Sequence, residues 1–237
     1  MYTSAATLRT FYDQTETIPC ATREHPVLVL PGFMACDLST TLLRSYLRHR
    51  GHAAITWGFG RNVGPVDGLM ERLVDRVKAV ADAAGERVTL VGHSLGGIYA
   101  REIAKSAPEV VSTVFTLGSP VRALVHEDRD ANAAMLQAIE RAIGRTVDEV
   151  CAQGWFDDLA AAPPVRCVAL YSRRDAIAPW QSCLGIESAL LDHVEVDTTH
   201  RRMIVSPAVF RAIDERIAEP RCFVEMEEPV LARSLVA

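Results

Sequence analysis

The sequence lacks the features that would point to nucleic acid or to a membrane. Its 25 Lys and Arg are outnumbered by 30 Asp and Glu, which gives a formal net charge of −5. No stripe of basic residues is available to neutralise phosphates. No apolar run approaches the ~20 residues that span a bilayer. We therefore expect neither a nucleic-acid partner nor a transmembrane segment.

A secretory signal and an ordered cysteine pattern are also missing. Residues 1–17 are interrupted by Arg9, Asp13 and Glu16, so they lack the apolar core of a signal peptide. The cysteines form no C-x-x-C pair and no cluster with histidine at ligand spacing, which argues against a zinc site and indicates reduced thiols. They are Cys20, Cys36, Cys151, Cys167, Cys183 and Cys222. These absences predict a cytoplasmic protein without a metal ion.

Apolar residues, in contrast, are plentiful. They make up 49% of the 237 residues, and charged residues make up 23%, so the chain can bury a large core and is neither disordered nor a coiled coil. Because α/β folds often reach this length, we expect a single domain over residues 1–237.

Short apolar runs recur along the chain and are typical of strands that are buried on both faces of a parallel sheet. They cover residues 27–30, 52–57, 88–91, 110–117, 165–171 and 194–196. Helical patterns lie between and after them, over residues 39–50, 67–84, 95–106 and 206–217. This alternation predicts a three-layer α/β fold with a mainly parallel sheet of about six strands.

One segment is longer than a single crossover needs. Residues 121–164 are rich in alanine and charge, and they indicate one or two helices, over 131–143 and 147–160. We expect a short helical insertion over one edge of the sheet, before the last two strands, that serves either as a mobile lid or as a fixed wall. The C-terminal tail, residues 219–237, shows no period and either wraps the body or frays.

The most informative motif is Gly92-His93-Ser94-Leu95-Gly96, a G-x-S-x-G between a predicted strand and a predicted helix. In this context the serine sits on a sharp, strained turn that exposes its hydroxyl, and the small residues on either side let strand and helix approach. Ser94 is therefore the candidate nucleophile. The Leu95 N–H, at the helix N-terminus, is a candidate donor to a developing oxyanion.

A serine nucleophile needs a base, and the base needs an acid to fix its tautomer. His200 follows the last predicted strand, at the carboxyl end where α/β proteins form their sites. The other six histidines are expected elsewhere: His25 and His52 at the far end of the sheet, His49 on a surface helix, His93 with its side chain pointing away, His126 in the insertion and His193 at the start of the last strand. Chain order favours Asp175 as the acid, after the penultimate strand, with Asp197 as the runner-up.

The loop after the first strand supplies a second candidate oxyanion donor, the Phe33 N–H. Several apolar residues can be interpreted either as an acyl pocket or as ordinary core. They are Met34, Ile177, Trp180, Met203, Trp155 and Phe156, besides Phe33 and Leu95. Four arginines flank the proposed acid and base, namely Arg173, Arg174, Arg201 and Arg202. They either favour an anionic group in the substrate or are solvated rim residues.

These residues resemble the α/β-hydrolase superfamily, most of all its small bacterial lipase and esterase branch, over residues 27–217. The resemblance rests on Pro31-Gly32-Phe33, Gly92 to Gly97, Leu117-Gly118-Ser119-Pro120, Asp175 and His200. It implies an α/β-hydrolase fold and a serine carboxylic-ester hydrolase that works through an acyl-enzyme, without a metal or an organic cofactor. Two departures stand out: many relatives carry His-Gly in place of Pro31-Gly32, and small residues often follow the histidine where this chain has Arg201 and Arg202.

The same triad serves other reactions, so alternatives stay open. Thioester or amide hydrolysis and acyl transfer use the same residues, and a non-catalytic binding module of this fold is a further alternative. The absence of an export signal favours an intracellular esterase for short or medium acyl chains over a secreted lipase. The partner is then a small-molecule ester.

Overall fold

The computed structural model describes residues 24–124, 126–156 and 158–218. The N-terminal segment, the tail over residues 219–237, Cys20 and Cys222 lie outside these ranges. Among the described residues, no helix combines the length and the hydropathy that a membrane span requires. The four cysteines in these ranges form no disulfide with one another.

Six strands form one sheet in the order β2-β1-β3-β4-β5-β6, and every neighbouring pair is parallel. The strands are β1 (His25–Leu30), β2 (His52–Thr56), β3 (Val88–His93), β4 (Val111–Leu117), β5 (Arg166–Tyr171) and β6 (Leu191–Glu195). All seven residues of β4 are buried, as expected for a strand in the middle of a parallel sheet that is covered on both faces. The predicted sheet is confirmed.

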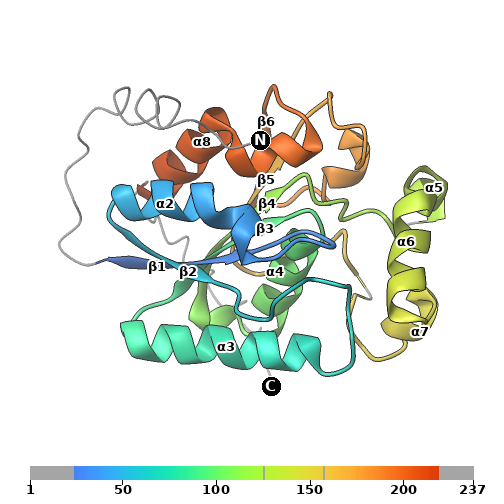
Figure 1. Cartoon of the computed structure of the whole chain (residues 1–237), viewed down its shortest axis with the longest axis horizontal. Coiled ribbons are helices and arrows are strands. Elements are labelled where there is room, and N and C mark those ends of the chain that lie inside the picture. Colours follow the sequence, from blue (N-terminus) through green and yellow to red (C-terminus); the bar gives the residue numbers. More distant parts are fainter. Residues whose placement is uncertain (1–23, 125, 157, 219–237) are drawn as a thin grey trace, which may run out of the picture.

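Helices cover both faces of the sheet (Figure 1). One face carries α2 (Thr41–His49) and α8 (Pro207–Ala218), and the other carries α3 (Leu69–Ala84) and α4 (Leu95–Ser106). Because successive strand residues point to opposite faces, Val27 and Val29 pack with α2 and α8, whereas Leu28 and Leu30 pack with α3 and α4. The three predicted layers are therefore confirmed.

The segment between β4 and β5 holds α5 (His126–Arg129), α6 (Ala133–Ile143) and α7 (Val147–Cys151). The expected helix over 147–160 is wrong beyond Cys151, because Gly154 and Phe156 adopt positive φ angles of 87° and 73°, which a right-handed helix cannot accommodate.

The insertion packs against the main body through its apolar residues. Its apolar residues pack on Leu95 and Ile98 at the start of α4 and on Ala123, which follows β4. These helices therefore stand beyond the carboxyl ends of the strands, as a group beside the main body (Figure 1). This is the end of the sheet at which the candidate site residues gather.

Candidate active site

Ser94 connects β3 to α4 through a strained backbone. Its φ of 52° and ψ of −121° lie in a region that costs a non-glycine residue about 1–3 kcal/mol. Its N–H donates to the carbonyl of Leu117 at 2.9 Å, which links the turn to the end of β4. The strain at this serine matches the sharp strand-to-helix turn that the motif predicts.

Two glycines permit this turn. A Cβ on Gly92 would collide with the backbone of Gly96 and Gly97. A Cβ on Gly96 would lie 2.5 Å from the carbonyl oxygen of Leu30 and 2.7 Å from that of Pro31. The start of α4 thus lies directly against the end of β1, and only glycine fits at these positions.

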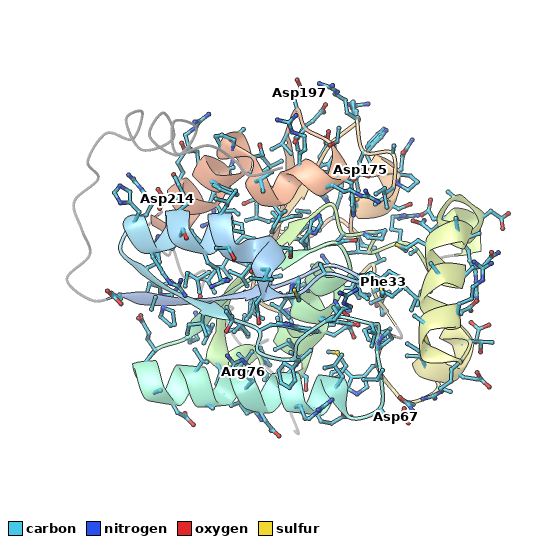
Figure 2. All side chains as sticks on the ribbon, viewed as in Figure 1. Phe33, Asp67, Arg76, Asp175, Asp197 and Asp214 are labelled. Atoms are coloured by element: carbon cyan, nitrogen blue, oxygen red, sulfur yellow. The ribbon has the colours of Figure 1, made fainter. Side chains whose placement is uncertain are left out.

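Asp175 and His200 form a short hydrogen bond. His200 begins a 3₁₀ helix (His200–Val205), and its Nδ1 lies 2.6 Å from Asp175 Oδ2. Since a carboxylate can only accept, Nδ1 carries the proton and Nε2 of the neutral ring is an acceptor. The other carboxylate oxygen accepts the N–H groups of Ile177 and Ala178, both at 2.8 Å. These contacts fix the carboxylate and, through it, the imidazole. Figure 2 shows the position of Asp175.

Asp197, the alternative acid, has a different partner. Its carboxylate accepts from Arg174 Nη1 at 3.0 Å, and its side chain is 81% exposed, whereas that of Asp175 is fully buried. The structure therefore joins Asp175, and not Asp197, to the histidine.

The end of β4 brings the serine and the histidine–aspartate pair together. Leu117, whose carbonyl accepts the Ser94 N–H, is followed by Gly118. A Cβ on Gly118 would lie 3.0 Å from Asp175 Oδ2 and 3.2 Å from His200 Nδ1. Within the described ranges no hydrogen bond joins Ser94 Oγ to the His200 ring. In unliganded enzymes this contact is often long and shortens when substrate binds.

The His93 side chain points toward His200, so the expectation that it points away is wrong. Its ring lies 5.0 Å from the His200 ring, centroid to centroid, and its Nε2 is 3.0 Å from the His200 carbonyl oxygen. Burial, with a smaller contribution from the charge of His200, lowers the pKa of His93 to about 4. The ring is therefore neutral at pH 7 and donates from Nε2. No sequence signal indicates this orientation of the His93 ring, because the backbone conformation at Ser94 sets it.

The two expected oxyanion donors lie on either side of Ser94. Leu95 is the first residue of α4, so its N–H has no acceptor within the helix. On the other side, a Cβ on Gly32 would be 3.2 Å from Ser94 Cβ, which brings the Pro31–Phe33 loop against the serine. In the part of the chain that the structure describes, the Phe33 N–H has no acceptor. Asn62, which the sequence analysis did not single out, contacts this loop through its side chain and backbone.

An apolar cavity of about 50 Å³ lies beside Leu95, between α4 and the insertion. Only apolar residues line it, among them Leu95, Ile98, Ile139, Val150 and Phe156. Phe156 thus contributes to a cavity next to the candidate oxyanion donor. An apolar space of this size suits part of an acyl chain better than water, which needs polar partners.

The other expected pocket residues are distributed differently. Met34 and Ile177 are exposed, by 47% and 42%. Met203 is fully buried beside Gly118, so in this conformation it lines no open pocket.

Trp155 and Trp180, also expected in the acyl pocket, contact residues outside the apolar cavity. The Trp155 indole donates to Glu71 of α3 at 3.0 Å. Trp180 stacks on Tyr171, with the Arg173 guanidinium 4.3 Å from the centre of its ring.

The flanking arginines divide into two pairs. Arg173 and Arg174 form exposed ion pairs with Glu195 and Asp197 at 3.1 and 3.0 Å. Arg201 and Arg202 are exposed beside His200, and they form no ion pair with any described residue. Only this second pair has its charge available to a ligand.

The two buried cysteines are poorly suited to act as nucleophiles. Burial raises the pKa of the Cys167 and Cys183 thiols, so neither is a ready thiolate nucleophile. No three His, Cys, Asp or Glu side chains of the described residues group in a way that could hold a metal ion.

The chain resembles several known proteins. A sequence model of the alpha/beta hydrolase family matches residues 27–226. Over 112 residues the chain is 34% identical to a triacylglycerol lipase of Pseudarthrobacter phenanthrenivorans and to one of Burkholderia plantarii, with 43% of this chain covered in each case. These matches span 35% and 31% of the two relatives, which is about a third of their length.

A solved structure reported for the metagenome-derived lipolytic enzymes LipS and LipT is similar with a TM-score of 0.60. It is 15% identical and covers 83% of this chain and 96% of its own. At this identity the likeness shows a shared fold.

Proposed function

Because the chain belongs to the alpha/beta hydrolase family, we propose that it hydrolyses carboxylic esters with Ser94 as nucleophile, His200 as base and Asp175 as the residue that orients the base. The observation that carries the proposal is the strained Ser94 at the turn into α4, beside a histidine held by a buried carboxylate at 2.6 Å. Nucleophile, base and orienting acid are the three parts that activate a serine. The names of the lipase relatives and lipolytic neighbours agree with this reaction class.

The reaction proceeds in two half-reactions. Ser94 Oγ attacks the ester carbonyl carbon while His200 Nε2 takes the hydroxyl proton, and the N–H groups of Phe33 and Leu95 stabilise the oxyanion. The carbon–oxygen bond to the alcohol then breaks, the alcohol leaves with the proton from His200, and Ser94 is acylated. Water repeats the attack on the acyl-enzyme, so the acid leaves and Ser94 regains its proton.

The acyl group belongs, in this proposal, to the apolar side of the site. The cavity beside Leu95 offers only apolar walls and about 50 Å³, which favours short or medium chains over long ones. We therefore expect turnover to peak at butyrate or octanoate and to be low for palmitate.

The proposal is tested with a fluorophosphonate probe and a series of p-nitrophenyl esters from acetate to palmitate. Wild type should be labelled and active, and Ser94→Ala should lose labelling and at least about 10⁴-fold in kcat. His200→Ala should lose kcat similarly. Matched controls are Ser106→Ala and His49→Ala, which change exposed residues at the ends of α4 and α2. Folded wild type that neither reacts nor turns over any ester would instead support a binding module.

A narrower proposal is that the ester carries an anionic group. The guanidinium groups of Arg201 and Arg202, which follow His200, are exposed and pair with no described carboxylate, and this supports the proposal, since two like charges near a site attract an opposite charge. We expect a higher kcat/KM for carboxylated esters than for neutral esters of matched length, and loss of this difference in Arg201→Ala/Arg202→Ala. Equal values for both esters in wild type would contradict the anionic substrate.

A further inference from the structure

Asn62 is a fully buried polar residue in the connection between β2 and α3. Its side-chain Nδ2 donates to the carbonyl of Pro31 at 2.9 Å. Its backbone carbonyl accepts the Met34 N–H at 2.6 Å, and its own N–H donates to the carbonyl of Ala35 at 2.8 Å. One residue therefore makes three hydrogen bonds to the loop that follows β1.

The two N–H groups that follow Phe33 in this loop both have acceptors. The Ala35 N–H donates to the Gly32 carbonyl at 3.1 Å, and the Met34 N–H is taken by Asn62. The Phe33 N–H lies between these held peptides and, among the described residues, has no acceptor. Met34 has a positive φ of 59°, an uncommon conformation for a long side chain that persists only where its surroundings hold it.

The other side of the Asn62 amide is also held. Its Oδ1 accepts the Gly64 N–H at 3.2 Å and the Tyr99 hydroxyl at 3.3 Å. Tyr99 is fully buried on α4, the helix whose first residue is Leu95. The Pro31 carbonyl, in turn, lies against Gly96 of the same helix. Asn62 therefore connects the loop of one proposed oxyanion donor to the helix that carries the other.

We propose that Asn62 is a positioning residue that sets the direction of the Phe33 N–H relative to the Leu95 N–H, so that both point at the oxyanion. The inference rests on the proposed ester hydrolysis. It assigns to a loop asparagine, distant from Ser94 in sequence, a part of the stabilisation of the tetrahedral intermediate. The hydrogen bonds from the Phe33 and Leu95 N–H groups to the oxyanion are stronger in the transition state than in the ground state. Misplacing one of these donors should therefore lower kcat and leave KM nearly unchanged.

Two substitutions of Asn62 separate its contacts. Asn62→Asp keeps an oxygen for Gly64 and Tyr99 but loses the donor to Pro31, and Asn62→Leu loses both side-chain interactions at similar size. For each folded variant, kcat should fall by about 10²–10³-fold with KM changed little. The affinity for a trifluoromethyl ketone, whose serine adduct carries an oxyanion, should fall by a similar factor. If Asn62 only stabilised the fold, the fall in kcat and the fall in ketone affinity would not match.

Tyr99→Phe removes only the hydroxyl that supports Asn62 Oδ1. It should lower kcat and ketone affinity together by about tenfold, the equivalent of one ordinary hydrogen bond, and it carries the test if neither Asn62 variant folds. Folded Asn62 variants that keep kcat and ketone affinity within about twofold would overturn the proposal, as would an unchanged Tyr99→Phe. Wild type that is inert to fluorophosphonate and to all esters would instead remove the proposed function itself.

Discussion

His93, the neighbour of Ser94 in sequence, contacts both His200 and the loop after β1. Its Nε2 donates to the backbone carbonyl of His200, and its Nδ1 faces Gly32, where a Cβ would be 3.0 Å away. Because its pKa is lowered to about 4, it stays neutral near pH 7. A charged His93 would repel the His200 imidazolium.

The lowered pKa of His93 makes the stability of the fold depend on pH. Between pH 6.5 and about 4 the unfolded chain binds a proton at this residue and the folded chain does not, so the free energy of unfolding falls as the pH is lowered through this window. The full difference is about 3 kcal/mol. In His93→Gln, which keeps a donor for the His200 carbonyl, this part of the dependence should vanish in urea titrations at pH 7, 5.5 and 4. Equal pH dependence in the two proteins would contradict it.

At the residue scale, the sequence predicted identities better than orientations. Chain order and strand ends were enough to select Asp175 and His200, which the structure joins, because parallel strands bring their carboxyl ends to one edge. The direction of the His93 ring depends on the backbone twist at Ser94. Asn62 lies in a loop without periodicity, where an asparagine normally signals only a turn.

At the element scale, prediction was accurate where burial sets the pattern. The apolar run at 88–91 corresponds to β3 (Val88–His93), and the helix over 95–106 has the expected bounds. The insertion was less predictable, since its alanine-rich sequence suits a helix over 147–160 whereas the chain turns after Cys151. There the fold is decided by long-range contacts, which no local pattern reports.

One of these contacts is a buried cation without a carboxylate partner among the described residues. Arg101 of α4 is fully buried, and its Nη2 donates to the carbonyls of Leu159, Ala160 and Ala161 at 3.2, 3.2 and 2.6 Å. The guanidinium thus fastens the segment through which the insertion returns to β5. Any movement of the insertion as a lid must then leave this attachment in place.

Arg101→Met tests this attachment. The variant fills a similar space but leaves three carbonyls without their donor, so the free energy of unfolding should fall by about 1–3 kcal/mol. Hydrogen exchange and limited proteolysis should increase in residues 152–164 before they increase in the sheet. The exposed Arg211 on α8 provides the control, because Arg211→Met should change stability by no more than about 0.5 kcal/mol. Unchanged exchange in the return segment of Arg101→Met would contradict this account.

At the scale of the whole molecule, the two ends of the parallel sheet carry different kinds of polar group. The carboxyl end holds the strained Ser94 and the Asp175–His200 pair. Near the amino end, Asp214 of α8 accepts from Arg50 Nε at 2.8 Å and lies 3.2 Å from His52 Nε2, at the start of β2. Figure 2 shows Asp214 well to the left of Asp175. In the proposed mechanism the Asp175 carboxylate orients the base, whereas the Asp214 carboxylate ties a helix to a strand.

The same substitution at the two carboxylates should therefore have opposite consequences. Asp214→Asn weakens two buried contacts, so it should lower the free energy of unfolding by about 1–3 kcal/mol and leave kcat/KM per folded molecule within twofold. Asp175→Asn removes the carboxylate that fixes the His200 tautomer, so kcat should fall by about 10⁴-fold. Urea titration and ester kinetics on both proteins test the pair. A large kinetic loss in Asp214→Asn would show that the amino end is coupled to the site through the sheet, and full activity in Asp175→Asn would remove Asp175 from the mechanism.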